Sequence, residues 1–179
     1  MPTTPPATPP ATPEALLAKL TELGVAHVNH RHVPVMTVEE SRALRGPLPG
    51  LHAKNLFLKD KKGGLWLVVA HECRTIDLKV LRKRLGAKSL SFGKPDLLKD
   101  VLGVAPGAVT PFAVINDSRG LVHVVLDDTL AQAAQANFHP LDNAQTTTVS
   151  GAGLLTFLKS LHHAPMIIDF TRDDSPATS

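Results

Sequence analysis

The chain has 179 residues and a hydrophobic content of 43%, which suits one domain with a single hydrophobic core. No apolar run approaches the roughly 18 residues that a membrane-spanning helix needs, and the N-terminus lacks the basic-then-apolar pattern of a secretory signal. We therefore expect a cytoplasmic protein without membrane contact. The lone cysteine, Cys73, excludes an internal disulfide and fits a reducing compartment.

The net charge of +3 is modest, but it is unevenly distributed. Between Lys54 and Asp100 twelve Lys and Arg residues stand against five Asp and Glu, whereas the remainder of the chain has seven against eleven. Such a surplus indicates attraction to a polyanion, although helix faces that carry charge only for solubility give the same pattern. Aromatic residues make up 4% and tyrosine is absent, which excludes a broad stacking platform for single-stranded nucleic acid.

The first twelve residues are almost entirely Pro, Thr and Ala and carry no charged side chain. They cannot bury enough surface to offset their chain entropy, so we expect a disordered tail over residues 1–12. A helix then begins with Thr12 as N-cap and Pro13 at its first position, and Gly24 ends it.

Three histidines, His27, His30 and His32, lie in or just after a strand that we predict from residue 25 onward. A metal site that combines them with His71 and Cys73 is one hypothesis, and surface or loop histidines are the alternative, because no acidic residue lies close by to complete a ligand set. Cys73 near His71 also suggests a nucleophilic thiol, against the more ordinary unreactive thiol at a strand end.

A capping box opens a short helix predicted over residues 37–44. The chain then enters a predicted β-hairpin, in which a strand over Ala53–Asp60 is joined by a basic, glycine-containing turn to an apolar strand over Leu65–Ala70. Lys54 and Asn55 stand at the start of the first strand, where side chains next to loops often form sites. A solvated Lys–Asn pair without a role is the alternative.

Much of the basic surplus falls on a helix that Asp77 begins and Gly86 ends. Its polar face and the loop after it carry the basic residues Lys79, Arg82, Lys83, Arg84 and Lys88. We next expect a strand over residues 89–92 and a helix over residues 95–102.

A second hairpin is predicted in which a strand over Phe112–Ile115 pairs with one over Leu121–Leu126. The later predicted elements are a small helix over residues 129–134, a polar loop over Ala136–Asn143, a strand over Thr146–Val149, a helix capped by Ser150 and running to about His162, an edge strand or coil over Met166–Phe170, and a mobile tail over residues 171–179.

These elements predict a mixed α/β fold over residues 13–170, with a central mixed, largely antiparallel sheet of about seven strands and five or six surrounding helices. Neither of the glycine-rich phosphate-binding motifs occurs, and HExxH, CxxC and GxSxG are absent as well. The sequence therefore disfavours a nucleotide-binding enzyme of those kinds, a zinc hydrolase and a serine esterase.

Four short segments, in this order along the chain, resemble the YbaK/ProX family of aminoacyl-tRNA deacylases, which are free-standing relatives of the editing domain of bacterial prolyl-tRNA synthetases. The segments are Lys54–Leu58, Phe112–Asp117, Asn137–Leu141 and Thr146–Val149. The resemblance extends over residues 13–168 and implies a single YbaK-like domain. The His-Pro form of the third segment looks like the branch that removes alanine from mischarged proline tRNA, because the cysteine-removing branch usually has a smaller residue before that Pro.

The resemblance implies roles for individual residues. Lys54 matches the family's essential lysine and Asn55 its polar neighbour, and His139 would set the pocket size or hold a water, so these three are the candidate catalytic residues. The family's Gly-x-x-x-Pro loop borders the aminoacyl pocket, and its first position is Ala136 here; alanine at a positive φ would be strained by about 1 kcal/mol. The implied pocket residues are Ala136, Asn137, Phe138, Pro140 and Asn143.

Hydrolysis of an aminoacyl ester develops negative charge on the carbonyl oxygen, and donors aimed at that oxygen lower the barrier. We expect backbone N–H groups of residues 136–140, Pro140 excepted, to serve there, and Lys54 to hold the terminal phosphate or ribose. The resemblance implies that the substrate's free ribose hydroxyl helps to activate water, and we expect no metal and no cofactor. Proline would be excluded by a hard steric wall.

The implied partner is the acceptor end of tRNA(Pro), whose phosphates the five basic residues from Lys79 to Lys88 would contact. Prolyl-tRNA synthetase is a candidate second partner, and the oligomeric state stays open. Two alternatives to an alanine deacylase are a Cys-tRNA(Pro) deacylase and a non-catalytic module of the same fold that binds tRNA or a synthetase.

Overall fold

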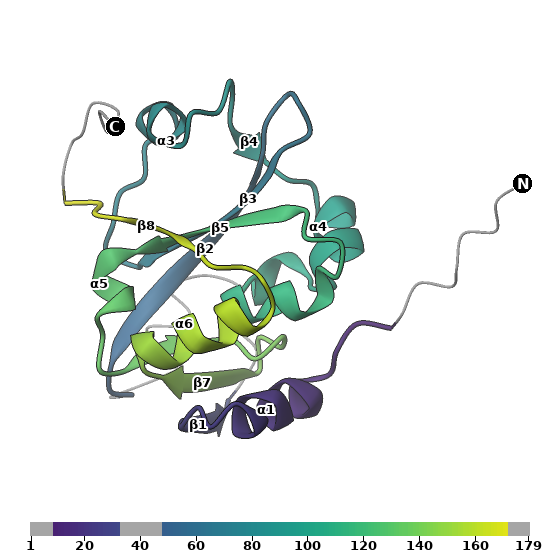
Figure 1. The fold of residues 1–179 in the computed structure, drawn as a ribbon, viewed down its shortest axis with the longest axis vertical. Coiled ribbons are helices and arrows are strands. Elements are labelled where there is room, and N and C mark those ends of the chain that lie inside the picture. Colours follow the sequence, from purple (N-terminus) through teal and green to yellow (C-terminus); the bar gives the residue numbers. More distant parts are fainter. Residues whose placement is uncertain (1–8, 33–47, 172–179) are drawn as a thin grey trace, which may run out of the picture.

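The computed structural model describes residues 9–32 and 48–171. Within them eight strands form one sheet, in which seven follow the order β1-β7-β6-β2-β3-β5-β8 and β4 pairs with β2 outside that order (Figure 1). The strands are β1 (His27–Arg31), β2 (Leu51–Lys59), β3 (Leu65–His71), β4 (Ser91–Phe92), β5 (Val122–Asp127), β6 (Ala136–Phe138), β7 (Gln145–Val149) and β8 (Met166–Ile168).

Strand pairing is mixed, as predicted. The pairs β1–β7, β6–β7, β2–β3 and β2–β4 are antiparallel, and the pairs β2–β6, β3–β5 and β5–β8 are parallel. β2 joins the two halves, because it pairs with β3 along most of its length, with β6 over its first residues and with β4 over its last. The mixed, largely antiparallel sheet is confirmed, with eight strands in the described residues instead of about seven.

The helices cover both faces of this sheet. The helices of the described residues are α1 (Pro13–Glu22), α3 (Leu78–Leu85), α4 (Pro95–Leu102), α5 (Asp128–Ala131), α6 (Gly151–Ser160) and two 3-10 helices, η1 (Pro106–Ala108) and η2 (Pro111–Asn116). Side chains of α1, α4, η2 and α6 enter one large hydrophobic core, whereas α3 packs into a smaller core with β2, β3, β5 and β8. Figure 1 shows α6 crossing the sheet and α3 beside the far end of the β2–β3 hairpin.

The alternation of β2 decides which core each of its side chains enters. Phe57 belongs to the larger core and the adjacent Leu58 to the smaller one, and Leu56 packs against the smaller core as well. Neighbouring residues of a strand point to opposite faces of the sheet. The even-numbered residues of this part of β2 therefore face α3, and the odd-numbered residues face the larger core.

Three of the predicted helix starts are confirmed in atomic detail. The side chain of Thr12 accepts a hydrogen bond from the backbone N–H of Ala15 and that of Ser150 from the N–H of Gly153. Asp77 likewise accepts from the N–H of Lys79. Each cap satisfies a backbone donor that the first helical turn leaves without a partner, which places the helix boundary where the capping residue stands.

The predicted strand over Phe112–Ile115 is wrong, because these residues lie in the 3-10 helix η2. The side chain of Thr110 accepts from the N–H of Phe112, and Pro111 occupies the first helical position. A short apolar run cannot by itself distinguish a buried strand from a buried helical turn. β5 therefore pairs with β3 and β8, both in parallel, and not with this segment.

The end of η2 ties distant parts of the chain together. Asp117 accepts hydrogen bonds from the N–H groups of Leu121 and Val122, and its carboxylate also contacts Nε2 of His163 at 2.9 Å. Asp117 and His163 are both buried, and these hydrogen bonds compensate the Asp117 carboxylate for the water that it loses on burial. The Phe112–Asp117 segment therefore supports the core.

The segment Ala136–Asn143, predicted as a polar loop, begins with strand β6. Asn137 is buried, but its side chain donates to the carbonyl groups of Pro49 and Leu51 and accepts from Thr148 Oγ1. These partners satisfy a polar side chain inside the sheet, and this is why a polar sequence forms a buried strand here.

Several predictions fall on residues outside the described ranges: most of the N-terminal tail, the helix over residues 37–44, and the C-terminal tail beyond Thr171. Ala11, expected within the tail, donates its N–H to Asn116 Oδ1 at 2.8 Å, so the chain already contacts the domain one residue before the helix cap. In the described part of the chain, no helix is both long and apolar enough to cross a membrane.

Close approach of α6 to α5 requires glycine at the first position of α6. A Cβ atom added at Gly151 would lie 2.2 Å from the carbonyl oxygen of Ala131 and 2.3 Å from that of Leu130, and backbone atoms cannot move aside cheaply. We predict that Gly151→Ala lowers the free energy of unfolding by about 1–3 kcal/mol, measured by urea denaturation. Ala152→Ser, at the adjacent exposed position, is the control and should stay near wild type; equal values for both variants would contradict this packing.

Candidate functional site

Lys54 and His139 stand where two neighbouring strands part. β2 and β6 run parallel, with Leu51 opposite Ala136 and His52 opposite Asn137 as the last pair. Lys54 and His139 each follow that last pair by two residues, so both lie at the same end of the ladder. Because side chains two residues apart share a face of a strand, the two positions also belong to the same side of the sheet, which is the side that α3 covers over the β2–β3 half.

The ammonium group of Lys54 is held by the loop that follows β3. Its Nζ donates to the backbone carbonyl of Arg74, and the side chain is half-buried. Burial lowers the pKa of Lys54 below the usual value for lysine, and the nearby Cys73 sulfur partly offsets this by favouring the charged form. The contact holds the ammonium group next to the loop that follows β3.

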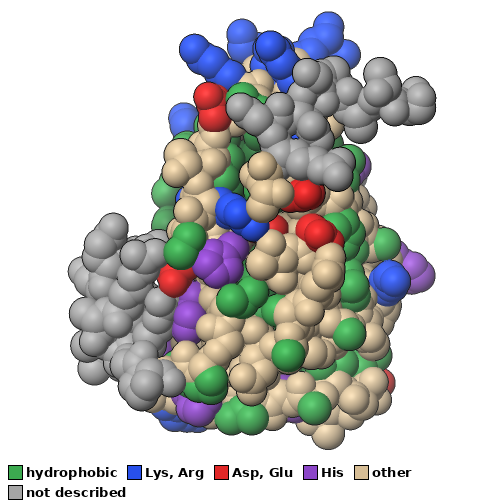
Figure 2. Space-filling model, turned by 90° about the vertical axis from the view of Figure 1, so that its left-hand side faces the viewer, with side chains coloured by type: hydrophobic (Ala, Val, Ile, Leu, Met, Phe, Trp, Pro, Cys, Tyr) green, Lys and Arg blue, Asp and Glu red, His purple; other side chains and the backbone are tan. Residues whose placement is uncertain are grey.

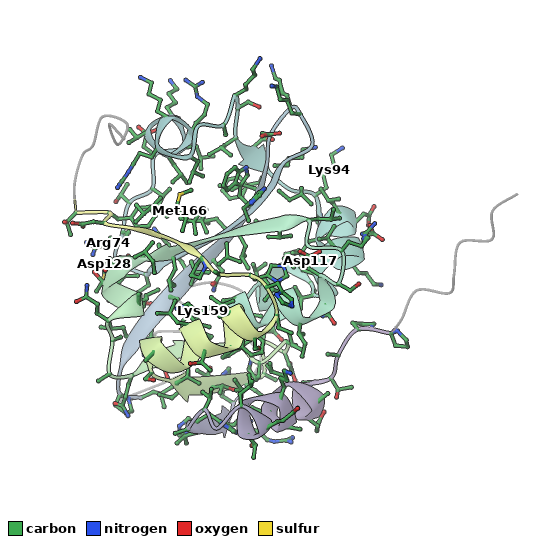
Figure 3. The ribbon with its side chains drawn as sticks, in the orientation of Figure 1. Arg74, Lys94, Asp117, Asp128, Lys159 and Met166 are labelled. Carbon is green, nitrogen blue, oxygen red and sulfur yellow. The ribbon has the colours of Figure 1, made fainter. Side chains whose placement is uncertain are left out.

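Arg74 is held in turn by the fully buried Asp127 at the end of β5. Nε of Arg74 lies 3.2 Å from Asp127 Oδ2, which also accepts from the N–H of His71, and Arg74 Nη2 donates to Thr129 Oγ1. Figure 3 shows Arg74 beside Asp128, the residue after Asp127, at one side of the sheet. Two strand ends thus support the carbonyl group on which Lys54 rests. Sequence reasoning missed this arrangement, because no pattern links residues 53 positions apart.

Asn55 points away from Lys54. As its strand neighbour it faces the larger core, on the side of Phe57 and Ala53. Its Oδ1 atom is buried and has no hydrogen-bond partner among the described residues. The structure therefore does not bring the side chains of Lys54 and Asn55 together, although they are adjacent in sequence.

His139 has a defined hydrogen bond and a histidine neighbour. Its Nδ1 lies 2.8 Å from the carbonyl oxygen of Gln145, and its ring centroid lies 6.2 Å from that of His32, whose Nε2 contacts Thr146 Oγ1. Burial lowers the pKa of His139 below the usual histidine value, which the bond to Gln145 only partly offsets. A carbonyl oxygen can only accept, so neutral His139 carries its proton on Nδ1, and Nε2 is left as an acceptor.

The turn after His139 is ordered by Asp142. Its Oδ1 accepts from the N–H of Ala144 and its Oδ2 from the side chain of Gln145, and these bonds lower the pKa of Asp142 below its usual range. Leu141 has a φ of 70°, the conformation that a turn this tight requires. The turn presents the Gln145 carbonyl to His139.

The residues expected to line the pocket divide between sheet and turn. β6 lies between β2 and β7, so the backbone N–H groups of its three residues point along the sheet and not toward a substrate. Ala136 has no positive φ, so alanine in place of the family glycine is not strained. Phe138 points into the larger core, edge-on to Phe112 at 5.8 Å, and Pro140 is buried; Asn143, in the turn, is half-buried.

The five basic residues predicted to contact RNA have different surroundings. Lys79, Lys83 and Lys88 are exposed, and Arg82 donates to the carbonyl group of Lys88 at 3.2 Å. Arg84 instead turns toward the C-terminal segment: its Nη1 donates to the Asp169 carbonyl.

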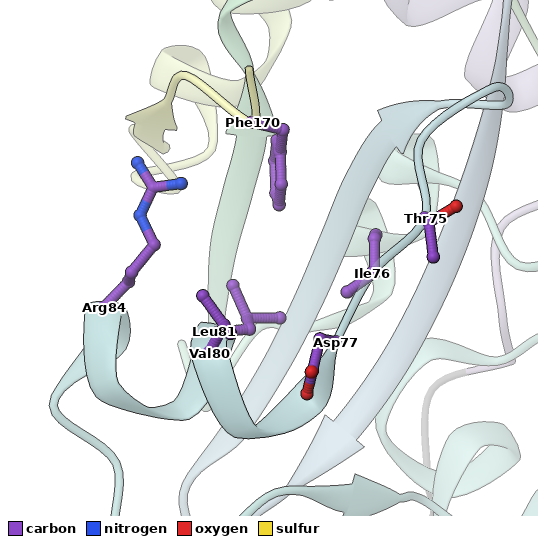
Figure 4. A pocket seen from close by; sticks show the side chains of 7 residues that line it. All are labelled: Thr75, Ile76, Asp77, Val80, Leu81, Arg84 and Phe170. Carbon is purple, nitrogen blue, oxygen red and sulfur yellow. The ribbon is translucent and has the colours of Figure 1, made fainter. Parts of the chain in front are cut away.

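Arg84 also borders a small hollow between α3 and the chain end. Its guanidinium carbon lies 5.9 Å from the centroid of the Phe170 ring. The hollow has a volume of about 90 Å³, and Figure 4 shows the side chains that line it: Thr75, Ile76, Asp77, Val80, Leu81, Arg84 and Phe170. Thr75 directly follows Arg74, so this hollow begins one residue from the carbonyl group that binds Lys54.

The histidines proposed as metal ligands do not gather into a site. Across residues 9–32 and 48–171 the structure holds no cluster of three or more His, Cys, Asp or Glu side chains placed to bind a metal ion. His27 Nδ1 instead contacts the carbonyl group of Val25, and His71 Nδ1 accepts from the N–H of Cys73. Cys73 is exposed in the loop that holds Lys54.

Comparison with known proteins gives a consistent result. Residues 32–157 match the family model described as an aminoacyl-tRNA editing domain. The chain is 38% identical over 148 residues to the "Prolyl-tRNA editing protein ProX" of Acetoanaerobium sticklandii, covering 82% of this chain and 90% of that one. It is 41% identical over 162 residues to "Prolyl-tRNA synthetase associated domain-containing protein 1" of Xenopus laevis, covering 88% and 96%.

Solved structures show the same fold. A protein proposed to be a trans-editing enzyme for prolyl-tRNA synthetase superposes with a TM-score of 0.66 at 16% identity, over 89% of this chain and 96% of that one. At this level of identity the likeness concerns the fold alone.

The lowered pKa of His139 predicts a specific pH dependence of stability. As the pH falls below about 6.5, this histidine takes up a proton in the unfolded chain but stays neutral in the folded chain until a lower pH. Its contribution to the free energy of unfolding is therefore fully present above about pH 6.5 and is lost as the pH falls through the folded-state pKa. We predict that His139→Gln loses less stability than wild type between pH 7.5 and pH 5.5, measured by urea denaturation. An equal loss of stability in both proteins would contradict the assignment.

Proposed function

The chain belongs to the aminoacyl-tRNA editing domain family, of the YbaK/ProX type, and we propose that it is a trans-editing hydrolase that removes alanine from mischarged tRNA(Pro). The observation that carries this proposal is that Lys54 and His139 each follow the last β2–β6 pair by two residues, on the same face of the sheet. A fixed cation and a neutral imidazole on one face of the sheet are suited to the hydrolysis of an ester that ends an RNA chain.

Lys54 supplies positive charge in this mechanism. Water attacks the carbonyl carbon of the aminoacyl ester, the bond to the ribose oxygen breaks, and the ribose hydroxyl and the free amino acid leave. Negative charge develops on the carbonyl oxygen during the attack, and a cation held in a partly dry site stabilises it more than water does. The Arg74 carbonyl keeps the ammonium group in place before the substrate arrives, so little reorganisation is needed.

His139 orients the attacking water. With its proton on Nδ1 and bonded to Gln145, the imidazole offers the Nε2 lone pair as an acceptor for a water O–H. The lowered pKa keeps this lone pair available near neutral pH. The substrate's free ribose hydroxyl assists in activating the water, so the reaction needs no serine nucleophile.

The pairing of β6 on both sides removes its N–H groups from the proposed mechanism. The stabilising donors expected from residues 136–138 face β2 and β7. We therefore assign the stabilisation of the oxyanion to Lys54. In the segment over residues 136–143, His139 and Asn143 are the polar side chains that remain proposed for the pocket. We assign Asn55 a supporting role from the opposite face of β2, because its side chain faces the core.

The tRNA partner is proposed to contact the basic face of α3 and the loop after it, with Lys79, Lys83 and Lys88 as the exposed cations and Arg82 beside them. Arg84 is proposed to act mainly through the C-terminal segment that it binds. Prolyl-tRNA synthetase remains a candidate partner of the same complex, and a non-catalytic module that only binds tRNA or a synthetase is the alternative function.

Lys54→Ala tests the catalytic role directly. We predict that it lowers kcat/KM for Ala-tRNA(Pro) by about 10²-fold or more, because one charge-stabilising donor in an active site is typically worth that much. The exposed residue Lys159 on α6 provides the control, and Lys159→Ala should keep the wild-type rate. Unchanged thermal midpoints in both variants show that the fold is intact. A Lys54→Ala variant with full activity contradicts the proposed mechanism.

The amino acid removed is tested with a panel of mischarged tRNAs. We predict that Ala-tRNA(Pro) is hydrolysed fastest, Cys-tRNA(Pro) and Ser-tRNA(Pro) more slowly, and Ala-tRNA(Ala) slowest, in single-turnover assays with excess enzyme. Size sorting by a pocket gives modest ratios, about 10- to 200-fold per methylene, so the order matters more than the magnitude. Faster hydrolysis of Cys-tRNA(Pro) would favour the cysteine deacylase, and no hydrolysis of any substrate would favour the binding module.

A further inference from the structure

Three separate segments form one basic surface at the far end of β2. The turn between β2 and β3 carries the exposed Lys61 and Lys62, the loop after α3 carries the exposed Lys88, and α3 adds Lys83. Figure 2 shows Lys and Arg side chains gathered at this end of the molecule, and in Figure 3 nitrogen-tipped side chains project there from α3 and from the hairpin turn. We call Lys61, Lys62, Lys83 and Lys88 the basic end.

Hydrogen bonds hold these segments in fixed relation to one another. The N–H of Lys61 donates to Ser89 Oγ at 3.0 Å, and Arg82 of α3 donates to the carbonyl group of Lys88. β4 then pairs with the end of β2, with Lys59 opposite Ser91. The loop after α3 is therefore clamped between the helix and the hairpin turn, and the lysines are presented from a rigid support.

Few acidic groups weaken this surface. Asp60 lies in the hairpin turn, but its Oδ1 accepts from the N–H groups of Lys62 and Gly64. Asp77 caps α3 at the opposite end of that helix. Outside residues 54–100, the described chain has only four Lys or Arg residues, Lys19, Arg31, Arg119 and Lys159. An RNA whose 3′ end is bound at Lys54 therefore has one concentrated region of positive charge available to it, the basic end.

The distance from Lys54 matches the geometry of a tRNA end. The strand makes five residue-to-residue steps from Lys54 to Lys59, which is about 17 Å at roughly 3.3 Å per residue, and the turn lies beyond Lys59. The four unpaired nucleotides at the 3′ end of a tRNA span roughly 14 Å when stacked at about 3.4 Å each. With the ester at Lys54, the first base pair of the duplex therefore comes at about the distance of the basic end.

We propose that the basic end, with the hairpin turn Lys61–Lys62 as its centre, binds backbone phosphates of the first base pairs of the acceptor stem, so that the substrate is an aminoacyl ester carried on duplex RNA. This proposal rests on the proposed function. Phosphate contacts position a nucleic acid without reading its sequence, and A-form RNA is bound largely in this way. The surface therefore supplies affinity and register, and the site at Lys54 supplies the chemistry.

The test compares two substrates that share the ester but differ in the duplex. One is full-length Ala-tRNA(Pro), and the other is the alanyl ester of the trinucleotide CCA. We expect the double variant Lys61→Glu/Lys62→Glu to lower kcat/KM for the tRNA at least tenfold in low salt and to change the trinucleotide rate less than twofold. Lys159→Glu, which reverses one exposed charge on α6, should change neither.

A second measurement makes the result independent of catalysis. Binding of uncharged tRNA(Pro), followed by fluorescence anisotropy from 50 to 300 mM salt, should weaken in the double variant, with a slope of log Kd against log salt reduced by about one to two. An unchanged affinity and slope would overturn the proposal, as would an equal loss of rate on both substrates. If wild-type protein hydrolyses neither substrate, the proposed function fails, and the binding measurement still decides whether the basic end holds duplex RNA.

Discussion

The pairing of β2 on both of its edges is the constraint on which the molecule depends. One edge pairs with β3, and the other with β6 at its start and β4 at its end, so this strand joins every part of the sheet. The β2–β6 ladder ends after His52 and Asn137, and the two chains separate with Lys54 and His139 on the same face. The ladder holds both backbones in place up to the point where the two strands stop pairing.

The support of Lys54 shows how buried polar groups organise a functional edge. Asp127 is fully buried and gathers Arg74, the N–H of His71 and the N–H of Thr129 around one carboxylate. Each of these partners belongs to a segment next to a strand end, so the carboxylate fixes the loop whose carbonyl group receives the lysine. A buried carboxylate with these partners is far less costly than an isolated one, because hydrogen bonds and one cation replace its lost water.

Much of the fold could be predicted from local sequence, and the exceptions have physical causes. Caps at Thr12, Asp77 and Ser150 mark helix starts because they act within three residues. The strand predicted at Phe112 failed because a four-residue apolar run has no resolvable period, and Thr110 with Pro111 selects a helical turn. β6 was predicted as a loop because its polar Asn137 is satisfied only by partners that are distant in sequence, Pro49, Leu51 and Thr148.

The sequence by itself determined most of the helix boundaries and the central hairpin, and through resemblance it singled out Lys54 and His139 as candidate site residues. Tertiary structure alone decided that these two lie on one face of the sheet, that Asn55 faces the other, and that Arg84 serves the C-terminal segment. The reason is that capping and alternation act over a few residues, whereas strand order and the pairing of a buried charge depend on contacts between segments that the chain brings together only when it folds.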